Sequence, residues 1–327
     1  MLFKKFLPAV FMLLAMIFAA SGCSGSGGAV KTAGTVGSDK VQVYTTIFPA
    51  YDFAGKVGGD RVEVHSIMPA GADPHHWEPT PGDIVKIGGS DVFIYCGAGL
   101  ETWVDNILKS GVREGMVVVD CSRGIELLQG GHEDPADVGS AESTEGHDHG
   151  SAKTDPHIWL DPVNASIMVD NILEGLIKAD PAGSGYYTAN AANYKARLAE
   201  LDGRYRSELA GVSIKKFVVS HAAFGYLARR YGLEQVPVRG LTGESEPSPA
   251  RMAEIVDVVR REGIKYIFFE PTASPRVTEA IAGETGAGTL VLNPISVLTD
   301  KEMEEGKDYI SFMEENLAAL KTACETR

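Results

Sequence analysis

The chain has 327 residues, and its 44 Asp and Glu outnumber its 30 Lys and Arg, so the formal net charge at pH 7 is −14. This acidity argues against nucleic acid as a partner, because nucleic acid is bound by basic surfaces. Four cysteines without a C-x-x-C pair are too few for a disulfide scaffold. From Val41 onward about 290 residues remain, which is enough for two domains that each bury a core.

Residues 1–22 have the features of a secretory signal peptide. Two lysines precede an apolar run over residues 6–20, which is shorter than the roughly 20 apolar residues of a membrane-spanning helix. Small residues then precede Cys23, which resembles the lipobox of lipoproteins, although Leu is usual where Ala20 stands. We therefore predict an extracytoplasmic protein anchored to the membrane by a lipid on Cys23, with ordinary cleavage near Ala20 or an uncleaved anchor as alternatives. Residues 23–40, rich in Gly, Ser, Ala and Thr, have the composition of a flexible tether.

The region 41–180 alternates strand and helix patterns. Short β-branched or aromatic runs predict strands at 41–47, 62–67, 91–95 and 116–119. Helices are predicted to begin near Pro49, Pro81 and Leu100, and a further one covers 162–178. Because strands that alternate with helices form parallel sheets, this region predicts an N-terminal α/β lobe.

A polar run at 130–153 interrupts this alternation. It has almost no large apolar residue, so we expect it to be disordered when free. His132, His147 and His149 lie there among acidic residues, and imidazole and carboxylate are both zinc ligands. We predict that the run captures metal as an auxiliary to a main site; a merely solvated acidic loop is the alternative.

Residues 181–212 predict one long linking helix, with apolar side chains from Tyr187 to Tyr205 at spacings of three and four. Residues 213–327 then repeat the strand and helix alternation. Strands are predicted at 217–220, 235–238, 266–270 and 289–292, and helices at 224–231, 249–262, 275–282 and 301–321. The predicted fold is α/β, with two lobes built on mainly parallel sheets and joined by a bracing helix.

The pattern D-P-H-x-W occurs twice, as Asp73 to Trp77 and as Asp155 to Trp159. In each copy the proline stiffens the loop that presents the histidine. His221 follows a third strand-like run. Ligands of open α/β sheets bind outside the carboxyl ends of the strands, where all three histidines can reach. Three histidines from three distant loops therefore predict a metal site.

Four segments together resemble the metal-binding solute-binding proteins of ABC transporters, in particular the zinc-binding, ZnuA-like branch: Gly71–His75, Trp77–Pro81, Asp155–Pro162 and Ser220–Leu227. The resemblance covers essentially residues 41–325. It implies two pseudo-symmetric (β/α)4 lobes with one metal in the cleft between them. It also implies delivery of that metal to a membrane permease powered by a separate ATPase.

The resemblance assigns the metal ligands to His75, His157 and His221. Manganese-binding members carry a carboxylate at the third position, whereas imidazole suits Zn²⁺, so we predict Zn²⁺ as the transported ligand. Members that use an acid as the fourth ligand have it where this chain has Asn293. We therefore predict three histidines plus water, or plus a carboxylate from the 130–153 run. Glu270 is an outside candidate, whose alternative role is to hydrogen-bond a neighbouring histidine.

Several alternatives stay open. A manganese-binding or adhesin-type member of the same family would share the fold. A three-histidine zinc hydrolase would need a carboxylate base, and no H-E-x-x-H motif occurs, so a binding protein is favoured over an enzyme. His76 is interpreted as a neighbour of the site and His65 as structural. Cys96 and Cys121 are predicted to be separately buried thiols, with a disulfide as the alternative, and the protein is expected to be a monomer.

Overall fold

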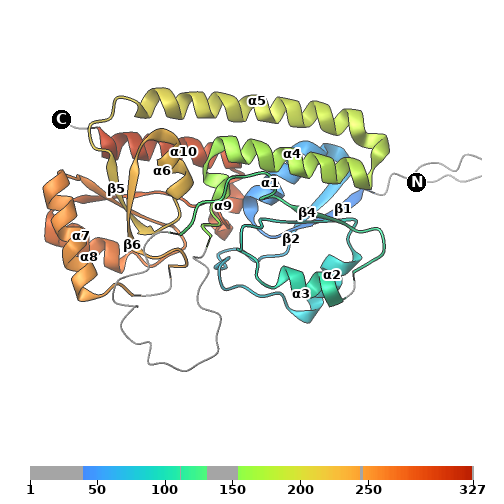
Figure 1. Ribbon diagram of the computed structural model, residues 1–327, viewed down its shortest axis with the longest axis horizontal. Coiled ribbons are helices and arrows are strands. Elements are labelled where there is room, and N and C mark those ends of the chain that lie inside the picture. Colours follow the sequence, from blue (N-terminus) through green and yellow to red (C-terminus); the bar gives the residue numbers. More distant parts are fainter. Residues whose placement is uncertain (1–39, 111, 131–153, 244–245, 326–327) are drawn as a thin grey trace, which may run out of the picture. The chain divides into compact units, whose positions relative to one another are not determined.

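The computed structural model describes residues 40–110, 112–130, 154–243 and 246–325 (Figure 1). The predicted signal peptide, the predicted lipidation at Cys23 and the three histidines at 132, 147 and 149 lie outside the described residues. In the described ranges no helix is both long and apolar enough to cross a membrane.

The first sheet is parallel and four-stranded, with the order β2-β1-β3-β4. Its strands are β1 (Val41–Thr45), β2 (Val62–Ser66), β3 (Val92–Tyr95) and β4 (Val117–Asp120). The helices of this lobe are α1 (Phe48–Gly58), α2 (Pro81–Gly89), α3 (Val104–Ser110) and α4 (Pro162–Ala179). Helix α2 starts with a capping box, in which Thr80 and Asp83 exchange hydrogen bonds and Pro81 occupies the first turn, so it begins where the sequence predicts.

Helix α3 begins at Val104, later than the predicted start near Leu100. The intervening segment turns instead, because Gly97, Ala98 and Gly99 all have positive φ. The buried carboxylate of Glu101 stabilises this turn by accepting hydrogen bonds from the backbone N–H groups of Cys96 (2.9 Å) and Gly97 (3.0 Å). The turn therefore moves the start of the helix from the predicted Leu100 to Val104, and it lies directly after the carboxyl end of β3.

The second sheet is also parallel and four-stranded, with the order β6-β5-β7-β8. Its strands are β5 (Lys216–His221), β6 (Glu234–Arg239), β7 (Tyr266–Phe269) and β8 (Gly288–Val291). Its helices are α6 (Gly225–Tyr231), α7 (Pro249–Glu262), α8 (Arg276–Thr285), α9 (Asp300–Glu305) and α10 (Tyr309–Cys324). The prediction of one helix over 301–321 is wrong. Gly306, in the left-handed conformation, ends α9, and the Asp308 side chain caps α10 by accepting from the Ser311 N–H at 3.0 Å.

Helix α5 (Ser184–Leu209) runs alongside both lobes, next to α4 and α10 (Figure 1). Its buried face contains the side chains that the spacing predicts, from Tyr187 to Tyr205, together with Ala191 and Leu209. One continuous hydrophobic cluster includes Val43 of the first sheet, Phe217 of the second, and the buried faces of α5 and α10. The two lobes are therefore packed on a shared core, and the predicted fold class is confirmed.

Helix α10 joins the two lobes directly. At its start Tyr309 packs on Phe53 of α1, with the ring centroids 4.9 Å apart. At its end the carbonyl of Cys324 accepts from the Ile214 N–H, just before β5, at 3.1 Å. Cys96 and Cys121 directly follow the paired strands β3 and β4, and both are buried free thiols.

Candidate metal centre

His75, His157 and His221 come together between the two lobes. His75 lies on the loop between β2 and α2, His157 precedes the short 3-10 turn Ile158–Leu160 ahead of α4, and His221 ends β5. The Nε2 atoms of His157 and His221 are 3.3 Å apart, and the His75 ring centroid is 5.0 Å from that of His157. Each of the three offers a ring nitrogen within 4.8 Å of the others. In the described part of the chain, these three side chains are close enough to share one metal ion.

The two D-P-H motifs fold in the same way. The Asp73 carboxylate accepts from the His75 N–H at 2.9 Å, and the Asp155 carboxylate accepts from the His157 N–H at 3.0 Å. Each is a turn in which an Asp side chain bonds the backbone two residues ahead. The sequence repeat is thus a structural repeat that fixes the backbone of both histidines.

The tryptophans that end the two motifs hold these segments in place. Trp77 packs edge-on against Trp103 of the first lobe, with the ring centroids 5.7 Å apart. Trp159 is fully buried and donates its indole N–H to the carbonyl of Pro294 in the second lobe at 2.7 Å. Trp77 therefore attaches the His75 loop to the first lobe, whereas Trp159 attaches the His157 segment to the second lobe as well.

Buried carboxylates orient two of the three imidazoles. His157 Nδ1 lies 2.9 Å from Asp155 Oδ1, and His221 Nδ1 lies 2.6 Å from Glu270 Oε1. When Nδ1 donates to a carboxylate, the tautomer is fixed and Nε2 is left to bind a metal. The predicted alternative role of Glu270, a hydrogen bond to a neighbouring histidine, is confirmed. The role of Asp155 is not predicted from the sequence, although the residue belongs to the motif.

The surroundings shift the pKa values of these groups in opposite directions. Burial lowers the pKa of His157 in spite of its contact with Asp155. Burial acts in the same direction on His221, but the charge of Glu270 and the hydrogen bond to it outweigh this effect and raise the pKa of His221. Burial favours neutral Glu270, yet His221 holds the pKa of Glu270 below its ordinary value. The neutral form is therefore favoured more strongly for His157 than for His221.

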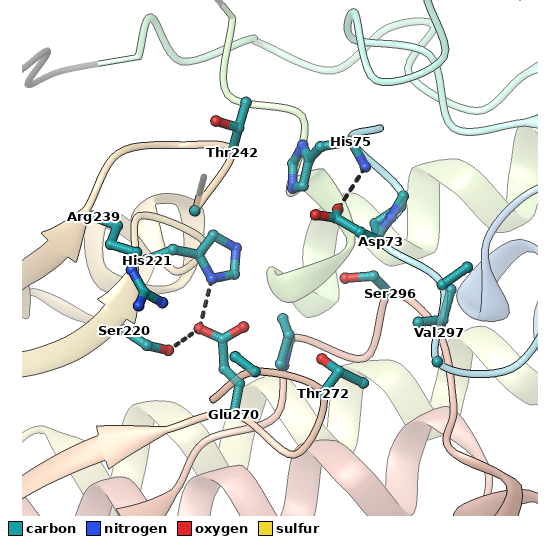
Figure 2. A pocket seen from close by; sticks show the side chains of 16 residues that line it. Asp73, His75, Ser220, His221, Arg239, Thr242, Glu270, Thr272, Ser296 and Val297 are labelled. Atoms are coloured by element: carbon teal, nitrogen blue, oxygen red, sulfur yellow. Dashed lines mark hydrogen bonds and ion pairs between the residues drawn. The ribbon is translucent and has the colours of Figure 1, made fainter. Parts of the chain in front are cut away.

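His75 and His221 line a pocket of about 120 Å³, which is large enough for an ion and several waters (Figure 2). Its lining includes Asp73, His75, His221, Arg239, Glu270 and Ser296. Asn293 does not line it: its Oδ1 accepts from the Ile295 N–H at 2.8 Å, and its Nδ2 donates to Glu302 at 2.7 Å. Asn293 thus stabilises the turn that leads to α9.

The remaining histidines of the described residues have other neighbours. His76 Nδ1 lies 3.0 Å from Asp73 Oδ2, beside the site, as the motif predicts. His65 lies in β2 and stacks on Tyr44, with the ring centroids 4.8 Å apart. Arg239, at the end of β6, also lines the pocket, and no motif in the sequence predicts its place there.

Two α/β lobes on a shared core, with three imidazoles converging between them, define a two-lobed metal-binding protein. Residues 43–323 match the family described as zinc-uptake complex component A, periplasmic (ZnuA), and the chain belongs to that family.

The chain is 39% identical over 322 residues to the high-affinity zinc uptake system protein ZnuA of Bacillus subtilis, which covers 98% of each chain. The crystal structure of the Zn(II)-bound ZnuA-like domain of Streptococcus pneumoniae AdcA is similar, with a TM-score of 0.74 and 36% identity over 88% of this chain and all (100%) of that one. The laminin-binding protein Lmb of Streptococcus agalactiae, described as bifunctional with adhesin and metal transporting activity, has a TM-score of 0.76 and 30% identity, again over 88% of this chain and 100% of its own.

Proposed function

We propose that this protein captures Zn²⁺ outside the cytoplasm and delivers it to the permease of an ABC transporter, with His75, His157 and His221 as the ligands. One observation carries the proposal: three imidazoles converge, and two of them are held by buried carboxylates with Nε2 directed inward. Membership of the zinc-uptake family and the similarity to a Zn(II)-bound structure support it. Lipidation at Cys23 and auxiliary capture by His132, His147 and His149 belong to the same proposal.

The donor set favours zinc over manganese. Mn²⁺ prefers hard oxygen ligands, whereas three imidazoles suit Zn²⁺. The carboxylates nearest to the rings are already engaged, since Glu270 Oε1 bonds both His221 and the Ser220 hydroxyl. The same engagement argues against a hydrolase, because a zinc hydrolase needs a carboxylate that can take a proton from metal-bound water.

Release is proposed to begin at the His75 loop. The shared core and α5 hold the lobes together, and the His157 segment is attached to both lobes. The His75 loop contacts the second lobe more sparingly, through a hydrogen bond from the Gly71 N–H to the Leu298 carbonyl at 3.0 Å. Withdrawal of this loop would remove one ligand without moving the sheets.

Calorimetric titration of residues 39–327 with Zn²⁺ and with Mn²⁺ tests the site, with His221→Ala as the comparison. We expect one tightly bound zinc, preferred over manganese and weakened by orders of magnitude in the variant. Preference for manganese, or equal zinc affinity in the variant, would overturn the assignment. Delivery is tested in cells: deletion of the gene should impair growth when zinc is scarce, and zinc should restore it.

A further inference from the structure

Arg239 is a buried cation that lines the pocket beside Ser220 and His221 (Figure 2). Its side chain is 11% exposed, and no described residue accepts a hydrogen bond from its buried Nε. Its ion-pair partner is Glu246, at 3.4 Å, whose own side chain is 79% exposed. Folded proteins seldom leave a buried N–H of a charged group without an acceptor, so this group points to a missing ligand.

The two carboxylates that line the pocket, those of Glu270 and Asp73, do not accept hydrogen bonds from Arg239. Glu270 is hydrogen-bonded to His221 and Ser220, and Asp73 is hydrogen-bonded to the backbone of His75 and to the ring of His76. Arg239 makes no ion pair with either of them in the part of the chain that the structure describes. A permanent positive charge therefore faces the pocket that is to hold a divalent cation.

The three histidines leave one position of a tetrahedral zinc ion open. Asn293 is turned away from the pocket, and among the described residues no carboxylate joins the three-histidine group. A guanidinium edge is matched in shape and charge by two oxygens on one carbon. An anion between Arg239 and the metal would fill the open zinc position and would accept hydrogen bonds from Arg239. It would also reduce the repulsion between the two positive charges.

We propose that the pocket binds Zn²⁺ together with a small carboxylate or carbonate-type anion. One oxygen of the anion occupies the fourth zinc position, and the other accepts hydrogen bonds from the Nη groups of Arg239. The pocket volume of about 120 Å³ has room for such an anion. The inference rests on the proposed zinc capture and specifies what completes the metal's coordination.

The test is a zinc titration of the full chain against a competing chelator, at fixed pH and ionic strength, with acetate or bicarbonate replacing perchlorate. The variants are Arg239→Gln and, as the matched control, Arg229→Gln, which removes an exposed arginine of α6 that pairs with Glu126. We expect the zinc affinity of the parent and of Arg229→Gln to rise about tenfold for each tenfold increase in the concentration of the anion that binds with zinc, because one anion is bound per zinc ion. Arg239→Gln should still bind zinc but lose this dependence.

A second readout is the visible spectrum of Co²⁺ bound in place of zinc, which reports on the coordination sphere. Acetate or bicarbonate should change this spectrum in the parent and leave it unchanged in Arg239→Gln; which of the two acts identifies the source of the anion. Zinc affinity that is independent of both anions, or equally dependent in Arg239→Gln, would overturn the inference and leave zinc capture intact. Absence of zinc binding in every buffer would instead refute the proposed function.

Discussion

Glu270→Gln isolates what the buried carboxylate does for the metal site. The substitution preserves the size of the side chain, and its amide oxygen can still accept from His221 Nδ1. It removes the negative charge that lies 2.6 Å from that ring. Loss of a carboxylate behind a metal-binding histidine typically weakens metal binding by roughly 10–100-fold, or about 1.4–2.7 kcal/mol. We expect a loss of this size in zinc affinity at pH 8.

The size of the loss should depend on pH. Glu270 raises the pKa of His221, so in the parent a proton competes with zinc for this ring as the pH falls. Glutamine cannot raise it in this way, so the variant meets less competition at pH 6. The difference between parent and variant should therefore shrink from pH 8 to pH 6.

The assay is a chelator-competition titration at both pH values, with thermal unfolding of the metal-free proteins as a check on folding. Glu234→Gln, at the far end of the same sheet and exposed, is the matched control and should bind zinc like the parent. Equal affinity of Glu270→Gln and the parent at pH 8, or a difference that grows as the pH falls, would refute the reasoning.

Three further predictions concern stability and packing. In the metal-free protein the raised pKa of His221 contributes stability that is complete below its ordinary value of about 6.5 and is lost as pH rises through the raised value. The lowered pKa of His157 has the opposite effect on stability, but it is present in the parent and in Glu270→Gln alike. The midpoint of thermal unfolding of the parent should therefore fall relative to that of Glu270→Gln between pH 6 and 8, and a constant difference would contradict this. Gly225→Ala would place a Cβ 2.7 Å from Asp155 Oδ2, displacing the carboxylate that orients His157, so zinc affinity should drop by roughly tenfold; unchanged affinity would count against the role of Asp155. Gly175→Ala would drive a Cβ into the Val119 side chain and should lower the free energy of unfolding by roughly 1–3 kcal/mol. For both, Gly203→Ala on α5 is the control, because its Cβ would meet nothing within 4 Å; equal stability of Gly175→Ala and this control would contradict the packing argument.

The strands and most helices can be predicted because their signals are local. Apolar runs, cap residues such as Thr80 and the D-P-H turns act within a few residues of themselves. The two errors, at α3 and between α9 and α10, arise where a glycine in a left-handed conformation redirects the chain. Gly306 and Asp308 are typical residues for the end of one helix and the start of the next, so the break between α9 and α10 has a local sequence signal.

The assembly of the site is less predictable because it depends on contacts between distant segments. The repeat identifies His75 and His157 as similar, but their convergence with His221 follows from the packing of two lobes on one core. The repeat is also misleading in one respect. Asp155 bonds the ring of its own His157, whereas Asp73 bonds the ring of His76. The position of Arg239 beside His221 follows from the pairing of β5 with β6, in which these two residues are register partners.

The core that runs through both lobes has a thermodynamic consequence for ligand binding. A protein that closes two separate domains over its ligand buries apolar surface, and the heat capacity falls accordingly. Here that surface is already buried without metal, as the contact of Tyr309 with Phe53 and the inclusion of Val43 and Phe217 in one cluster illustrate. The heat capacity change on metal binding should therefore be close to zero, so the enthalpy of binding should be nearly independent of temperature.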